Sequence, residues 1–145
     1  LRLNGFIPAI LYGGNEQNQK ICLNKKEYSI IGYKGKQVRD NIHSYDVVRF
    51  IDEFIKAPRP GEVYNLGGGR NNSISILEAF DLIEDVSGKK MQYHYQDSHR
   101  IGDHICYISD LSKMKSHYKK WNITKNLSNI FEEIYSDWDQ RLNKE

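Results

Sequence analysis

The most regular pattern of hydrophobic and polar positions lies near the end of the chain. Between residues 127 and 138, apolar side chains recur three or four positions apart, which is the spacing of one face of an α-helix. They are Leu127, Ile130, Phe131, Ile134, Tyr135 and Trp138. The pattern predicts a terminal helix with one apolar stripe.

A second helix is predicted over residues 45–56, with Ser44 as its N-cap and Pro58 and Pro60 after its end. Its apolar positions repeat at helical spacing and form the stripe Val47, Phe50, Ile51, Phe54 and Ile55. A third helix is expected after Ser75, because a serine followed three residues later by Glu78 fits the capping box. This helix should extend to Gly88, which suits the position just past a helix end.

Shorter segments read as strands, namely 28–32, 37–42, 63–66, 91–96 and 104–109. A short helix carrying Lys113 is expected after Ser109 or Asp110. In the opening segment, four apolar residues have helical spacing, but Pro8 and the glycine pair at 13–14 limit any helix to a turn or two. These four are Phe6, Ile7, Ile10 and Leu11.

Helices that alternate with short strands indicate the α/β class. The strands are too few for a free-standing doubly wound domain. We therefore expect a lobe that completes another domain. Within it, residues 1–27 are the least interpretable segment, and 28–145 form the recognisable part.

Composition narrows the classes of function. The chain has 145 residues, 39% of them hydrophobic, which suits one packed domain. Its 21 basic residues nearly balance 19 acidic ones, so no nucleic-acid-binding surface is indicated. No apolar run approaches the length of a membrane span. Two cysteines without a close pair form no disulfide framework, which favours a reducing cytoplasm.

Catalytic motifs are absent from the sequence. It contains no GxGxxG fingerprint for a dinucleotide and no Tyr-x-x-x-Lys pair for proton transfer. The glycine run 67–69 could form a phosphate-binding turn or a purely structural turn between a strand and a helix. We therefore expect no catalytic residue in this chain.

Two arginines are candidates for binding a diphosphate. Arg39 lies in a strand segment and Arg100 in a loop, and a guanidinium can bind two phosphate oxygens at once. Asp103 could accept hydrogen bonds from a ribose diol. Alternatively, Arg39 with Asp40 and Arg100 with Asp103 are surface ion pairs.

A metal site is not expected. The segment that carries His94, His99, His104 and Cys106 has wider spacings than zinc sites use. These residues are interpreted as surface or packing groups. No Gly-x-Ser-x-Gly elbow supports a serine nucleophile.

The segment 35–46 resembles the extended short-chain dehydrogenase/reductase family, whose nucleotide-sugar epimerases and dehydratases carry a Gly-x-x-x-Arg-Asp-x-x-His-x-x-Asp signature there. Four further stretches follow in the family's order, and a terminal helix that ends near a tryptophan closes the pattern. They are 63–67, 73–78, 100–103, and 108–110 with Lys113. Within the family, 35–40 and 67–73 most resemble CDP-tyvelose (CDP-paratose) 2-epimerases.

This resemblance implies the C-terminal, substrate-binding lobe of an extended Rossmann-type enzyme. It implies that Arg39 and Arg100 hold the diphosphate of a CDP-linked sugar and that Asp103 holds the ribose. Gln37 falls in the same nucleotide-sugar-binding set. His43, Asp46 and Asn65 are implied to be structural.

The NAD-binding half, with its catalytic tyrosine and lysine, would lie outside this chain, which begins without methionine. The complete enzyme would use NAD and form a homo-oligomer. Two alternatives stay open, a dehydratase or decarboxylase of the same superfamily and a non-catalytic fragment or binding module.

Overall fold

The computed structural model describes residues 7–10, 20–23, 28–96 and 102–142. Its strands are β1 (Ile7–Ile10), β2 (Lys20–Leu23), β3 (Tyr28–Ile31), β4 (Val38–Asp40), β5 (Ser73–Ser75), β6 (Tyr93–Gln96) and β7 (Cys106–Tyr107). Its helices are α1 (Ser44–Lys56), α2 (Ile76–Ser87), α3 (Ser112–His117) and α4 (Leu127–Leu142), with 3-10 turns η1 (Tyr33–Gly35) and η2 (Arg70–Asn72).

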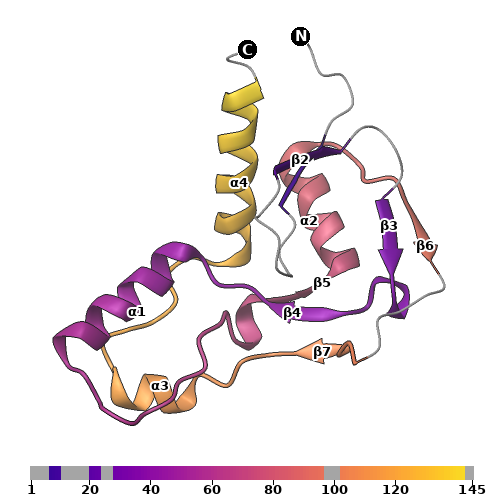
Figure 1. Cartoon of the computed structure of the whole chain (residues 1–145). Coiled ribbons are helices and arrows are strands. Elements are labelled where there is room, and N and C mark those ends of the chain that lie inside the picture. Colours follow the sequence, from indigo (N-terminus) through magenta and orange to yellow (C-terminus); the bar gives the residue numbers. More distant parts are fainter. Residues whose placement is uncertain (1–6, 11–19, 24–27, 97–101, 143–145) are drawn as a thin grey trace.

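The strands form three small sheets (Figure 1). In the largest, β4 is central, pairing antiparallel with β5 and parallel with β7. β3 pairs with β6 in parallel, and β1 pairs with β2 as an antiparallel hairpin. β4 and β7 point the same way, so the segments that follow them meet at one edge of the sheet.

The main apolar core lies between α1 and α3. Its buried members are Phe50, Leu111, Met114, Tyr118 and Trp121. The ring of Phe50 meets those of Tyr118 and Trp121 edge to face, with centroids 5.4 and 5.7 Å apart. Aromatic pairs in this arrangement add stabilisation beyond their buried area. The core therefore fixes α1 and α3 against the segment that runs toward α4.

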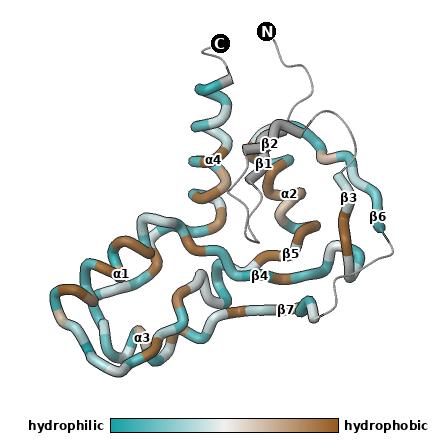
Figure 2. The backbone as a smooth tube through the Cα atoms, viewed as in Figure 1, coloured by the Kyte–Doolittle hydropathy of each residue, from teal (hydrophilic) through white to brown (hydrophobic). Residues whose placement is uncertain are grey.

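A second packed region surrounds α2. The capping box predicted from the sequence is confirmed, because the Ser75 hydroxyl accepts from the Glu78 amide and Glu78 accepts from the Ser75 amide. The helix ends at Gly88 in the left-handed conformation, as expected. Phe80 packs edge-on against Tyr28 of β3, and the tube of α2 carries several hydrophobic stretches (Figure 2). α2 also lies against α4.

Two expectations about secondary structure are wrong. Residues 63–66 are extended, but none of the described strands pairs with them. Residues 7–10 form a strand instead of a helical turn, because β2 supplies a partner. The α1 stripe is only half buried, since Ile51 and Ile55 are 48% and 70% exposed.

The other predicted helices and strands form, with shorter strands at 38–40 and 106–107 than the pattern suggested. The N-caps of α1 and α3 differ from the expected ones, being His43 in place of Ser44 and Leu111 in place of Ser109 or Asp110. α4 is confirmed over its full predicted stripe. None of the described helices is long and apolar enough to cross a membrane.

Candidate functional site

Arg39, Gln37 and Asp103, here named the Arg39 cluster, come together beside the first residues of β4 and β7. An Nη2 hydrogen of Arg39 donates to Asp103 Oδ1 at 2.9 Å. Gln37 Nε2 donates to the other carboxylate oxygen, Oδ2, at 2.7 Å. The parallel pairing of β4 with β7 brings these side chains together across more than sixty positions of sequence.

The carboxylate of Asp103 is thus held at both oxygens, and the backbone beside it is also anchored. The Tyr33 hydroxyl donates to the Asp103 carbonyl oxygen at 3.1 Å. The side chains of Arg39 and Asp103 remain 39% and 28% exposed, so a ligand in solution can reach both. The cluster is therefore ordered and accessible.

Some of the N–H groups of Arg39 already donate hydrogen bonds within the protein. Besides Asp103, it donates to the carbonyl oxygens of Val38 and His104, at 2.8 and 2.7 Å. These three bonds use three of the five N–H groups that a guanidinium carries. The Nε hydrogen and one Nη1 hydrogen remain, and each can donate to a separate oxygen of a ligand.

Of the two ion pairs expected as the alternative, Arg39 with Asp40 is wrong, because Arg39 pairs with Asp103. The other, Arg100 with Asp103, is not tested. Consecutive side chains of a strand point to opposite faces, so Arg39 and Asp40 cannot meet easily. Arg100 lies outside the described residues.

Asp40 is a residue whose role the sequence reasoning missed. Its Oδ2 accepts the backbone amides of Gly69, at 2.9 Å, and Ser109, at 3.1 Å. It therefore ties the glycine turn to the segment after β7. A Cβ on Gly67 would collide with this carboxylate and with the Ser109 hydroxyl, so a larger residue there would have to displace both side chains. The signal was present in the sequence as an aspartate and a run of three glycines.

His43 caps α1, and Ser44 does not. The Nδ1 atom of His43 accepts the Tyr45 amide at 3.0 Å, and its Nε2 lies 2.9 Å from a Glu133 carboxylate oxygen in α4. Since Nδ1 accepts, the ring hydrogen of a neutral His43 lies on Nε2 and points toward Glu133. His43 thus links the start of α1 to α4.

Asp46 is completely buried in the first turn of α1. Its carboxylate accepts the Thr124 hydroxyl at 2.7 Å and the amides of Thr124 and Lys125 at 2.9 and 3.0 Å. Arg49 adds a longer contact at 3.2 Å. Burial alone would raise the pKa of Asp46, but these donors outweigh it and hold the pKa below the ordinary value of 3.8.

His43 and Asp46 both join α1 to other segments of the fold, and the structural role that the resemblance implies for them stays a prediction. Asn65, the third such residue, is exposed in the extended segment before the glycine turn. Its side chain makes no hydrogen bond with the described part of the chain. Its role stays a prediction.

The histidines of the segment 94–106 make separate contacts. His94 pairs with the Ser29 hydroxyl at 3.0 Å, and the backbone of His104 supports Arg39. His99 lies outside the described residues. Across the described ranges, no three histidine, cysteine or carboxylate side chains are grouped so that they could hold a metal ion.

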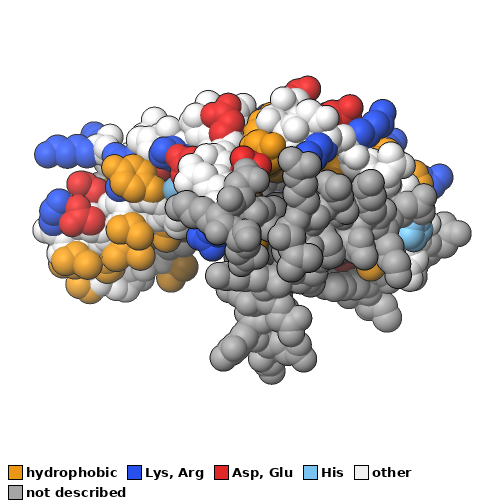
Figure 3. All heavy atoms as spheres, turned by 90° about the horizontal axis from the view of Figure 1, so that it is seen from above, with side chains coloured by type: hydrophobic (Ala, Val, Ile, Leu, Met, Phe, Trp, Pro, Cys, Tyr) orange, Lys and Arg blue, Asp and Glu red, His pale blue; other side chains and the backbone are white. Residues whose placement is uncertain are grey.

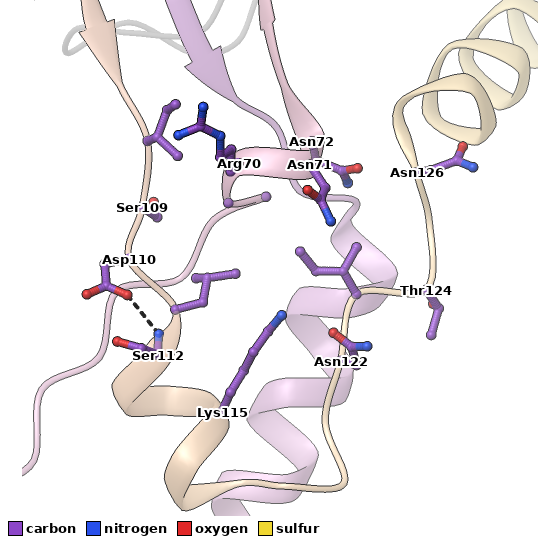
Figure 4. A pocket seen from close by; sticks show the side chains of 15 residues that line it. Arg70, Asn71, Asn72, Ser109, Asp110, Ser112, Lys115, Asn122, Thr124 and Asn126 are labelled. Carbon is purple, nitrogen blue, oxygen red and sulfur yellow. Dashed lines mark hydrogen bonds between the residues drawn. The ribbon is translucent and has the colours of Figure 1, made fainter.

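A pocket of about 680 Å³ opens at the edge of the sheet where β4 and β7 end, and we name it the carboxyl-edge pocket. Its lining comes from three segments, 68–72, 108–112 and 122–126, together with Lys115 of α3. Lys115 reaches into this pocket toward the side chains of Asn71 and Asn122 (Figure 4). The side chains of the Arg39 cluster are not part of the lining.

Comparisons with known proteins agree with the fold. A scan of the chain against protein-family models finds no match. A UDP-glucose epimerase of Bacillus subtilis, itself described as uncharacterised, is 35% identical over 99 residues, which are 66% of this chain and 30% of that protein. A CDP-paratose 2-epimerase of Salmonella typhi is 32% identical over 91 residues, which are 61% and 26% of the two chains.

Solved structures match more of the chain. A UDP-glucuronic acid 4-epimerase of Bacillus cereus, bound to its substrate and NAD, matches with a TM-score of 0.68 and 28% identity over 80% of this chain and 36% of the other. A UDP-glucose 4-epimerase of Thermotoga maritima matches with a TM-score of 0.67 and 26% identity, over 81% and 36%.

The class that these findings define is an α/β lobe with the fold of the C-terminal part of nucleotide-sugar epimerases. The relatives that the chain resembles are nucleotide-sugar epimerases, and the Bacillus cereus structure holds NAD. The chain spans less than a third of the length of the curated relatives, between 26% and 30%.

Proposed function

We propose that this chain is the substrate-binding lobe of an NAD-dependent nucleotide-sugar epimerase and that the Arg39 cluster binds the nucleotide. The observation that carries the proposal is the contact between the guanidinium of Arg39 and the carboxylate of Asp103 on an accessible surface. This pair belongs to a fold that the chain shares with enzymes whose solved structures hold UDP-sugars.

Each member of the Arg39 cluster has a distinct part in this proposal. The two remaining N–H groups of Arg39 donate to diphosphate oxygens, and Arg100 supplies a second guanidinium. The carboxylate of Asp103 accepts from the ribose hydroxyls. Gln37 fixes its orientation through the 2.7 Å bond. A contact so far from the reacting carbon contributes by orienting the sugar.

We propose a CDP-linked sugar as the substrate, with 2-epimerisation of CDP-paratose as the reaction. A CDP-paratose 2-epimerase is among the relatives, and segments 35–40 and 67–73 resemble that group. UDP-sugars are the alternative, because the other relatives are named for them.

The cofactor would be held by a part of the enzyme that this chain does not contain, since the dinucleotide fingerprint and the Tyr-x-x-x-Lys pair are absent from it. NAD supplies hydride removal and return at one sugar carbon when it is bound. This chain's residues hold and orient the nucleotide. The chain alone should therefore not turn over CDP-paratose when NAD is added.

An apolar face of α1 supports the idea of a missing partner domain. Tyr45, Val48, Ile51 and Ile55 lie on one side of the helix and are 48% to 70% exposed. Hydrophobic side chains gather on the surface over this helix (Figure 3). The extended segment 62–66 adds Val63, which is 79% exposed. We propose that the dinucleotide-binding part covers this face and pairs with the segment.

The test is calorimetry of CDP and UDP binding to the enzyme that contains this chain. A charge-assisted contact contributes about 1.5–3 kcal/mol, so Arg39→Ala and Arg100→Ala should each weaken binding about ten- to a hundredfold. Arg39→Lys should keep only part of the original affinity, because lysine has the positive charge but lacks the planar guanidinium fork. Arg59→Ala is the matched control, since Arg59 is exposed and lies over the Tyr118 ring instead.

Unchanged affinity in both alanine variants would remove the diphosphate assignment and leave the fold similarity standing. Tighter binding of UDP than of CDP would replace the CDP assignment. NAD affinity should stay constant throughout, because the cofactor belongs to the other part of the enzyme.

A further inference from the structure

The carboxyl-edge pocket has no part in the function proposed above, and its position is informative. Segment 108–112 follows β7 directly, and segment 68–72 leads into β5 beside the last residue of β4. The pocket therefore lies outside the carboxyl ends of two parallel strands. In open α/β sheets this edge is where ligands bind, and a volume of about 680 Å³ is within the range of small-molecule sites.

The walls of the pocket are held together by hydrogen bonds within the protein. Asp40 holds the first two segments through the amides of Gly69 and Ser109. Buried Asn72 donates from its side chain to the Lys125 carbonyl at 2.8 Å, which joins the first segment to the third. Asp46 binds the same third segment, 122–126, through the backbone amides of Thr124 and Lys125. A ligand would therefore meet a preformed site and would not have to order it.

The polar groups in the pocket are unequally satisfied. Asp110 is the one carboxylate among its lining residues, and its Oδ1 accepts the Ser112 amide at 2.9 Å. Lys115 and Arg70 form no ion pair or hydrogen bond through their side chains with the described residues, in contrast to Lys113, which pairs with Glu62 at 2.6 Å. The lining thus carries two positive charges against one negative charge.

Two amide side chains, of Asn71 and Asn122, lie on the side of the pocket toward which Lys115 reaches, and they come from two different segments (Figure 4). The lining there also includes apolar side chains of Leu111 and Ile123. An ammonium brings three donors and each amide brings two more, a set that suits the oxygens of a small anion. We infer that the carboxyl-edge pocket binds a small oxyanion, the phosphate or carboxylate group of a metabolite, through Lys115 with Asn71 and Asn122.

The experiment is an amide-resolved NMR titration of the chain with sodium phosphate, and separately with sodium acetate, at an ionic strength kept constant with sodium chloride. Saturable shifts should appear at 68–72 and 108–112. Lys115→Gln should weaken the binding about fivefold or more, which is the loss of about one charge-assisted contact at an exposed site. Lys120→Gln is the matched control, because Lys120 is an exposed lysine outside the lining.

A stronger response to phosphate than to acetate identifies a phosphate site, and the reverse identifies a carboxylate site. Shifts that do not saturate with either anion, or that persist unchanged in the Lys115→Gln chain, would overturn the inference. Arg39→Ala separates this pocket from the proposed nucleotide site. It should leave the titration at 68–72 unchanged, and shifts centred on residues 37–39 and 103 would assign the anion to the Arg39 cluster instead.

Discussion

Asp46 offers the most direct test of how this lobe is held together. Its carboxylate is fully buried and joins α1 to the segment that leads into α4. In the Asp46→Asn variant the shape of the side chain is kept, but one acceptor oxygen becomes a donor and the negative charge is lost. The substitution therefore tests hydrogen bonding and charge without opening a cavity.

The magnitude follows from the donors that surround the carboxylate. One oxygen accepts the amides of Thr124 and Lys125, and the other accepts the Thr124 hydroxyl and an Arg49 N–H. If the amide oxygen keeps the two backbone donors, its NH₂ group faces Arg49, and two donors oppose each other. Bonds to a buried charge are worth about 1.5–3 kcal/mol each, so we expect a loss of about 2–4 kcal/mol in the free energy of unfolding.

Urea unfolding followed by tryptophan fluorescence measures this loss. Trp121 is 2% exposed and its indole N–H donates to the Asp46 carbonyl at 2.9 Å, so its emission reports on this region. Asp52→Asn is the control on the same helix, because Asp52 is exposed and pairs with Lys56 across the surface. An unfolding midpoint for Asp46→Asn equal to that of Asp52→Asn would refute the reasoning.

The same carboxylate predicts a pH dependence. Since folding lowers the pKa of Asp46, its charge stabilises the fold at pH values above 3.8, the ordinary pKa, and that contribution is lost as the pH falls through the lowered pKa. The stability of the original chain should thus fall more steeply than that of Asp46→Asn on acidification to about pH 3. Parallel slopes in the two proteins would show that Asp46 does not titrate with folding.

Three further predictions concern backbone and surface. A Cβ at Gly68 would lie 2.1 Å from a backbone oxygen, so Gly68→Ala should lower the free energy of unfolding by about 3 kcal/mol or more. Gly61 lies in open space, so Gly61→Ala should lower it by only about 1 kcal/mol, because of the positive φ at that position. Urea titration of the two variants compares these losses. Ser75→Ala should cost about 1 kcal/mol by removing the capping box, seen as a lower melting temperature in circular dichroism. The isolated chain should self-associate through the exposed apolar face of α1, and the substitutions Val48→Lys and Ile55→Lys should reduce the associated fraction in sedimentation velocity. A monodisperse original chain would contradict the proposal that this face binds another domain.

Local signals in the sequence were sufficient for the helices and for one cap. The stripe of α4 and the pairing of Ser75 with Glu78 depend on residues three or four apart, so their spacing alone predicts them. The strands were less predictable, because a strand exists only when a partner pairs with it. Segment 63–66 has the pattern of a strand and stays unpaired among the described residues, while 7–10 became a strand through β2.

The sequence by itself determined the α/β class, the likeness to nucleotide-sugar epimerases and the residue types suited to a diphosphate. Only the tertiary structure decided which of those residues meet. Arg39 pairs with Asp103 and not with its neighbour Asp40, because adjacent side chains of β4 point to opposite faces while the parallel strand β7 brings a distant loop alongside. The same alternation turns Asp40 toward Gly69 and Ser109, where it builds the wall of a pocket that spacing could not reveal. Contacts between segments this far apart depend on strand pairing and register, and these are properties of the folded chain.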